Sequence, residues 1–178
     1  ILMGGSAIQS FDEGTAEADV VDAVYEYIAR AALTNSRWRF ATNQQQISRL
    51  TAAPTGRYDA AYQLPSDLIM LSAVTINDEP IIYDTYGDKV YCDANETEVL
   101  VADYIFRADE AYWPPYFTMA VEFLIAAMLS ISVARDAQLA SLMEQKGEQF
   151  LMRARRLDSQ QQTTKKLNTS RFISQRRS

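Results

Sequence analysis

The sequence predicts an α+β protein in which a helical bundle carries an inserted antiparallel β-meander and ends in an extended C-terminal arm. Apolar residues recur at helical spacing near residues 15–34, 115–134 and 136–160. The segment between the first two of these helices instead alternates with a period of two and is rich in turn signals. With 178 residues and 48% apolar content, the chain is large enough to bury a core.

The changes in period define the predicted domains. The helical bundle comprises residues 1–37 and 108–160, and the β-subdomain inserted between them comprises residues 38–107. Beyond about residue 160 the sequence becomes polar, so residues 161–178 are predicted to form a basic C-terminal arm.

The first helix is predicted to begin at the N-cap Thr15. Glu17 and Asp19 lie in its first turn, where acidic side chains favour the helix dipole. Val20 and Val24 continue an apolar stripe on one side of this helix. The period-two region that follows contains four predicted strands and three shorter ones: Leu68–Ile76, Ile81–Tyr86, Lys89–Asp93 and Glu98–Arg107, with Trp38–Ala41, Gln45–Leu50 and Tyr58–Gln63.

The last two helices follow a proline-rich turn. Pro115 suits the first turn of a helix, and residues 119–134 are apolar on nearly all sides. That stretch has about 16 residues and includes Glu122, so it is predicted not to span a membrane, which takes about 20 residues. Glu122 is expected to face solvent or a subunit boundary. The final helix carries a predicted packing seam of Leu139, Met143, Gly147, Phe150, Ala154 and Leu157.

Composition argues against most enzyme chemistry. The chain has no histidine and a single cysteine, Cys92, which excludes Ser-His-Asp triads, Cys-His dyads and cysteine-rich metal sites. Adjacent acids occur only at predicted element boundaries, where capping explains them. We therefore predict no catalytic residues, no metal site, no cofactor and no enzymatic activity.

The net charge of −6 is unevenly distributed. Residues 150–178 carry eight basic side chains and one acid, so residues 1–149 carry a net −13. An acidic body with a basic end predicts two surfaces that meet different partners. The basic end is either a solvated tail, an arm that docks on a protein, or an arm that binds nucleic acid phosphates.

The order of motifs along the chain resembles the tail tubular protein A family, the head-to-tail adaptors of tailed bacteriophages. An Ala- and acid-rich helix, a tyrosine-rich β-region and a Gln-rich, Arg-containing end accompany five short motifs. These motifs are Ile1-Leu2-Met3-Gly4-Gly5, Ile8-Gln9-Ser10-Phe11, Trp38-Arg39-Phe40-Ala41, Tyr62-Gln63-Leu64-Pro65-Ser66-Asp67 and Trp113-Pro114-Pro115-Tyr116-Phe117.

The resemblance implies a virion structural protein, made in the host cytoplasm and located at the portal–tail junction. Its subunits would form a ring, commonly a dodecamer, around the DNA exit channel. The implied partners are other copies of the chain, the portal protein, a tail or nozzle protein and genomic DNA that passes without specific binding. An upstream N-terminal helix would complete the bundle.

Charge and topology then suggest which residues meet each partner. The portal-docking arm is predicted to use Lys165, Lys166, Arg171, Phe172, Ile173, Arg176 and Arg177. The tail-facing loops are predicted to contain Asp78, Glu79, Gly87, Asp88 and Asn95. The alternative is a nucleic-acid-associated accessory protein that uses the basic C-terminal arm.

Overall fold

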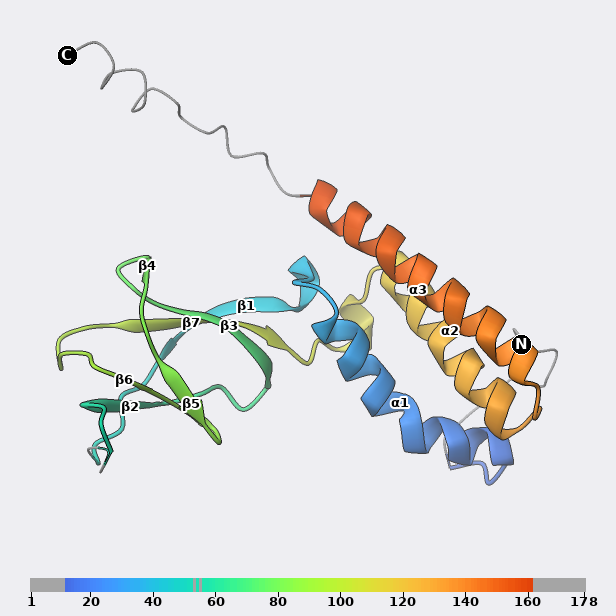
Figure 1. The fold of residues 1–178 in the computed structure, drawn as a ribbon, viewed down its shortest axis with the longest axis horizontal. Coiled ribbons are helices and arrows are strands. Elements are labelled where there is room, and N and C mark those ends of the chain that lie inside the picture. Colours follow the sequence, from blue (N-terminus) through green and yellow to red (C-terminus); the bar gives the residue numbers. More distant parts are fainter. Residues whose placement is uncertain (1–11, 53, 55, 162–178) are drawn as a thin grey trace, which may run out of the picture.

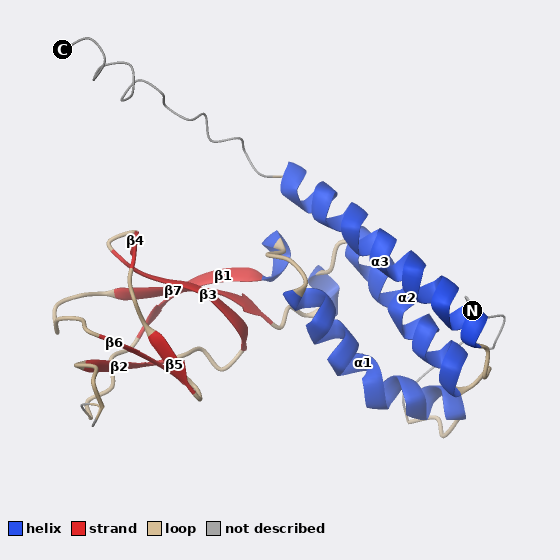
Figure 2. Ribbon diagram, viewed as in Figure 1, coloured by secondary structure: helices blue, strands red, loops and turns tan. Residues whose placement is uncertain are grey.

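A computed structural model describes residues 12–52, 54 and 56–161. Its helices gather at one end of an elongated molecule and its strands at the other (Figure 1; Figure 2). The elements in chain order are α1 (Ala16–Thr34), η1 (Arg39–Ala41), β1 (Thr42–Ile47), β2 (Ala60–Gln63), β3 (Leu68–Ile76), β4 (Glu79–Pro80), β5 (Asp84–Tyr86), β6 (Lys89–Cys92), β7 (Leu100–Phe106), η2 (Glu110–Tyr112), α2 (Pro115–Ser132) and α3 (Ala137–Gln160).

Local signals explain where the helices begin. The Thr15 hydroxyl accepts a hydrogen bond from the Ala18 amide at 3.3 Å and caps α1. The Asp136 carboxylate caps α3 by accepting from two backbone amides, those of Gln138 and Leu139, each at 3.0 Å. Pro115 occupies the first turn of α2, where its missing N–H costs nothing.

α2 and α3 form an antiparallel pair, and α1 packs mainly on α2; together these three helices are called the helical layer (Figure 1). α2 is apolar enough and, with 18 residues and a mean hydropathy of 1.5, long enough to meet the criteria for a membrane span. The argument from length against a span therefore does not hold for this helix. α2 packs against both neighbouring helices, and 33% of it is buried within the chain.

The strands form two antiparallel sheets with the orders β1-β7-β3-β4 and β2-β6-β5, here called the two-sheet unit. β7 is the centre of the larger sheet, where it pairs with β1 from Thr42↔Ile105 to Ile47↔Leu100 and also with β3. Side chains from both sheets share one core, in which Tyr62, Val90 and Tyr104 are buried. The two sheets therefore pack face to face.

The predicted fold class is wrong. The described residues form a mixed α+β fold with three helices and two antiparallel sheets, not a helical bundle of long helices with an inserted meander. The helices begin and end near the predicted positions, but they do not close a core by themselves. Their core includes Trp38 and Ala41 from the segment before β1, Ile105 from β7, and Trp113 from the loop before α2.

Non-local pairing explains the error in the strands. A meander would pair each strand with the next in sequence, whereas β7 pairs with β1 and β3 across long separations. The segment 38–41, predicted as a strand, instead contains the 3-10 turn η1. Trp38 explains this turn. Its side chain is fully buried, and its Nε1 donates to the Ala32 carbonyl at 2.9 Å, so the chain turns sharply after α1.

β7 connects the two cores. Ile105 belongs to the core of the helical layer, whereas the side chains of Leu100, Ala102 and Tyr104 belong to the core of the two-sheet unit. Phe106 packs against both cores. The alternation of a strand thus places neighbouring side chains in two different hydrophobic cores.

Candidate assembly surfaces

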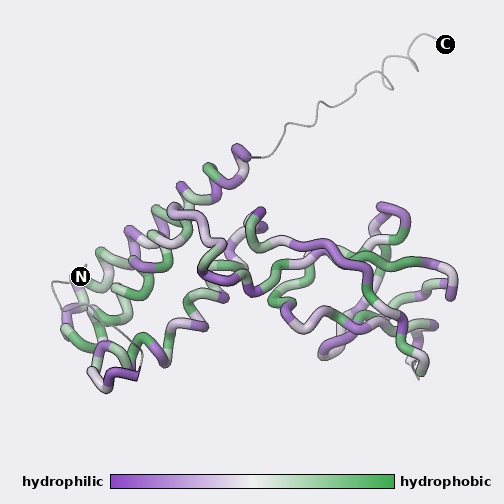
Figure 3. The backbone as a smooth tube through the Cα atoms, turned by 180° about the vertical axis from the view of Figure 1, so that it is seen from behind, coloured by the Kyte–Doolittle hydropathy of each residue, from purple (hydrophilic) through white to green (hydrophobic). Residues whose placement is uncertain are grey.

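The structure distributes the predicted site residues over several places. The predicted portal-docking residues of the arm, between positions 165 and 177, lie outside the described residues. The predicted tail-facing loops are described, but they do not come together. The β3–β4 turn and the β5–β6 turn lie at opposite edges of the two-sheet unit, and both are hydrophilic (Figure 1; Figure 3).

Hydrogen bonds show what the loop residues do within the chain. Asp78 has a positive φ of 66° and forms part of the tight β3–β4 turn that ends at Glu79, and Gly87 has a φ of 62° in the β5–β6 turn. The Asp88 carboxylate accepts from the Gln63 side-chain amide at 2.9 Å, and this hydrogen bond lowers the pKa of Asp88. The Asn95 backbone amide donates to the Glu98 carboxylate at 2.7 Å. These contacts account for the loops as turns of the fold.

The seam of α3 faces α2 along most of its length. Phe150 stacks on Phe123 with ring centroids 5.0 Å apart, and a Cβ on Gly147 would lie 2.8 Å from Leu124 Cδ2. Met143 and Ala154 are buried and Leu139 is half-buried, whereas Leu157 is 46% exposed and lies outside the contact. Glu122 of α2 is exposed.

Asp158, which the sequence does not single out, is a buried carboxylate that joins three segments of the helical layer. The residue is 5% exposed, and its carboxylate accepts hydrogen bonds from the Arg39 backbone amide and the Tyr116 hydroxyl, both at 3.1 Å. Burial raises the pKa of Tyr116 to about 12, and the neighbouring Asp158 carboxylate adds to the shift. The last turn of α3 is thereby fixed both to the start of α2 and to the segment that follows α1.

A groove lies beside this anchor. It has a volume of about 460 Å³ and is lined by Ser36, Met152, Arg155, Arg156 and Ser159, which we call the basic groove. Ser36 comes from the turn after α1, and the other four residues come from the end of α3. The position of Asp158 explains the geometry, because it holds the segment after α1 against the end of α3.

The basic groove carries uncompensated charge. Arg155 and Arg156 are exposed, and neither forms an ion pair within the described part of the chain. Arg37 and Arg39, beside the groove, are also exposed. Asp158, the one acid in the last turns of α3, is buried and already accepts two hydrogen bonds. The groove therefore offers guanidinium groups and the thioether of Met152 to an acidic partner.

A second polar junction holds α1 to the loop after β7. Arg107 contacts Glu26 at 3.1 Å and also binds Glu110, which in turn accepts from the Tyr25 hydroxyl at 2.8 Å. Burial opposes the charged form of Glu26 and Glu110, but hydrogen bonds outweigh it and lower both pKa values. Glu26 accepts from Arg30 and Arg107, and Glu110 accepts from Arg107 and Tyr25. Burial raises the pKa of Tyr25 to about 12, assisted by the hydrogen bond to Glu110.

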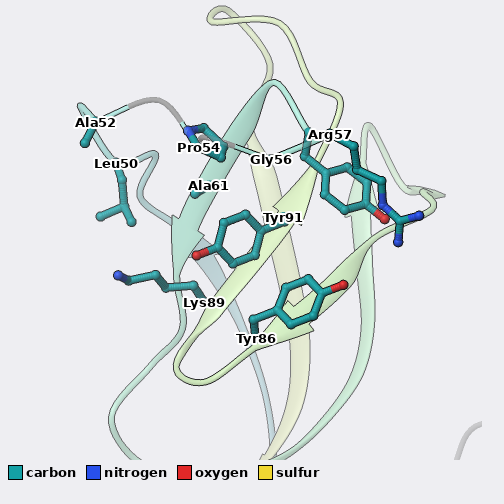
Figure 4. Close-up of a pocket in the computed structure, with 10 residues that line it drawn as sticks. Leu50, Ala52, Pro54, Gly56, Arg57, Ala61, Tyr86, Lys89 and Tyr91 are labelled. Carbon is teal, nitrogen blue, oxygen red and sulfur yellow. The ribbon is translucent and has the colours of Figure 1, made fainter.

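A second hollow lies on the smaller sheet. It has a volume of about 490 Å³, and Tyr86, Tyr91, Arg57 and Lys89 are among the residues around it (Figure 4). Tyr86 and Tyr91 meet edge to face with centroids 5.5 Å apart. Arg57 pairs with Asp84 at 2.7 Å, so its charge is already compensated within the chain.

Cys92 and the potential metal ligands are the groups on which nucleophilic or metal chemistry would depend. Cys92 is buried within the two-sheet unit, and burial raises the pKa of its thiol, which makes it a poor nucleophile. Over the stretch of chain that the structure describes, no group of three or more potential metal ligands lies together.

Comparison with known proteins assigns no family. The chain matches no protein-family model, and no curated protein matches it.

Proposed function

We propose that this protein is a virion structural protein, a head-to-tail adaptor whose copies form a ring between portal and tail around the DNA exit channel. Two observations support the proposal. The order of motifs resembles that of tail tubular protein A, and the chain folds into an elongated molecule with two differently constructed ends. The second observation carries the proposal.

The two ends differ in the surfaces that they offer. The free end of the helical layer is formed by the start of α1 and the turn between α2 and α3 (Figure 1), and the basic groove lies where α3 ends, on the side of the two-sheet unit. The two-sheet unit ends in hydrophilic turns (Figure 3). Each end has its own hydrophobic core, and β7 contributes side chains to both. An adaptor between a portal and a tail needs two unlike ends, because each end must recognise a different protein while the distance between the two contacts stays fixed.

Electron microscopy of the purified protein mixed with its cognate portal tests the proposal. We expect ring-shaped density on one face of the portal, with the helical layer against it. Portal particles that remain bare at saturating protein concentrations would contradict the proposal.

The nucleic-acid alternative is separated by a truncation after Gln161. In the adaptor, removal of the arm abolishes portal attachment and leaves the affinity for duplex DNA unchanged. In a nucleic-acid accessory protein, the same truncation instead removes a salt-sensitive DNA affinity, because each lost phosphate contact reduces counterion release.

A further inference from the structure

We propose that the basic groove receives the acidic first half of α1 from a second copy of the chain. This inference rests on the proposed ring and names the contact between its neighbouring subunits. The groove is formed by Ser36 and the last turns of α3, as described above.

The complementary surface lies on the outer side of α1. Asp19 and Asp22 are exposed there, and neither forms an ion pair with another described residue. The next acid on that side, Glu26, is already bound by Arg30 and Arg107. Between residues 12 and 29 the chain has six acids and no basic side chain. We call Asp19 and Asp22 the acidic face.

The acidic face and the basic groove lie at opposite ends of the helical layer. α1 begins at the end of the layer where α2 and α3 join, whereas α3 ends at the far side, next to the two-sheet unit (Figure 1). The two surfaces of one copy therefore cannot meet each other. A contact between unlike surfaces of two copies is head-to-tail, and head-to-tail contacts generate rings when the rotation closes.

Apolar side chains accompany the charges on both surfaces. Met152 in the basic groove is 53% exposed, and Tyr27, just beyond the acidic face on α1, is 78% exposed. Arginine and tyrosine are the residue types that contribute most to binding at protein interfaces. The contact would thus combine two guanidinium–carboxylate pairs with burial of an aromatic ring against a thioether.

Charge reversal with rescue tests this contact. The first variant is Arg155→Glu with Arg156→Glu, and the second is Asp19→Lys with Asp22→Lys. Each variant alone is expected to lose ring assembly on the portal, because like charges then face each other. An equimolar mixture of the two variants restores opposite charges at every contact, so we expect rings to return. Assembly is followed by mass photometry and electron microscopy.

Two controls keep the outcome interpretable. Asp59→Lys with Glu96→Lys, at two exposed acids of the two-sheet unit, changes the net charge by the same amount as the second variant, and it is expected to leave ring assembly unchanged. Far-UV circular dichroism establishes that each variant is folded.

The outcomes separate this contact from the proposed function. Rings of normal size in both reversal variants, or no recovery in the mixture, would overturn the contact while leaving the adaptor in place. Failure of the unmodified protein to form rings on the portal would instead overturn the proposed function. Loss of DNA binding in the Arg155→Glu, Arg156→Glu variant, with ring assembly intact, would assign the groove to nucleic acid and also overturn the contact.

Discussion

The helical layer and the two-sheet unit differ in how they bury apolar surface. In the two-sheet unit, two sheets face each other and close a core between them. In the helical layer, α2 is apolar on nearly all sides, yet only 33% of it is buried within the chain. Large apolar side chains remain exposed on its three helices: Tyr27, Met119, Met128, Ile131, Leu142, Met152 and Leu157.

This difference is the basis for our proposal about which half of the molecule meets its partners. A helix with apolar residues all round is typically covered on several sides, whereas α2 is covered by two helices of its own chain. Exposed apolar residues that lie together mark interaction sites more often than scattered ones do. Ile82, Tyr86 and Val99 of the two-sheet unit are exposed as well, but the helical layer has the larger number of exposed apolar side chains. We therefore propose that the helical layer is the assembly half.

The largest expected effect comes from a substitution in the core of the helical layer, to which β7 contributes Ile105. Trp38→Ala removes a fully buried indole that packs against Phe117 with centroids 5.1 Å apart. We expect the free energy of unfolding to fall by about 3–5 kcal/mol. Leu100→Ala, in the core of the two-sheet unit, is expected to cost about 2–5 kcal/mol.

Thermal unfolding followed by circular dichroism and tryptophan fluorescence measures both variants. Because β7 contributes to both cores, we expect one transition in each case, with the two probes coinciding. Two separate transitions would show that the halves fold independently.

The next effect concerns the anchor of the basic groove. Asp158→Ala leaves the Arg39 amide and the Tyr116 hydroxyl without their acceptor, so we expect a loss of about 2–3 kcal/mol in urea unfolding. Tyr116→Phe removes only one donor and is expected to cost about 1–2 kcal/mol. Equal costs for the two variants would contradict the role of Asp158 as a shared acceptor.

A smaller effect tests the close packing of α2 on α3. The methyl group in Gly147→Ala would lie 2.8 Å from Leu124 Cδ2, and we expect overpacking to cost about 1–3 kcal/mol. Adding Leu124→Ala makes room for that methyl group, so the double variant should lose less stability than the sum of the single ones. Gly56→Ala in the two-sheet unit is the matched control, because a methyl group there meets nothing within 4 Å. Its free energy of unfolding is expected to change by no more than about 0.5 kcal/mol. Strict additivity at 147 and 124 would refute the contact.

The smallest effect is a pH dependence at the second polar junction. The pKa values of Glu26 and Glu110 are lowered from their usual 4.5, so their charged forms favour the folded state above about pH 4.5. That contribution is lost as the pH falls through the lowered values. Arg107→Met should therefore flatten the decline in stability below pH 4.5. Arg30→Met should flatten it less, because Arg30 lowers the pKa of Glu26 alone, whereas Arg107 lowers the pKa of both carboxylates. Parallel curves for the unmodified protein and Arg107→Met would contradict this account.

Periodicity and capping residues were sufficient to predict the helices. Thr15, Pro115 and Asp136 begin the three helices, because each acts within one turn of its own position. The buried stripe of α1 includes Ala18 and Val21, whereas the predicted stripe ran through Val20 and Val24. The apolar spacing alone does not decide which face is buried, because contact with α2 selects it.

The sheets and the candidate site depended on contacts between distant parts of the chain. Nothing local distinguishes a meander from a β7 that pairs with β1, and no turn signal reveals that Ser36 lies beside Arg155. Asp158 appeared only as one acid among basic residues. Its spacing from Leu151 and Ala154, at steps of three and four, places it on the buried side of α3 and is the signal that could have found it.

Hydrogen–deuterium exchange on the protein alone and on its complex with the portal tests the central claim that the helical layer is the assembly half. We predict that assembly slows exchange in the first half of α1 and the last turns of α3, and leaves exchange in β2, β5 and β6 unchanged. Slower exchange confined to the two-sheet unit, with no change in the helical layer, would contradict the claim.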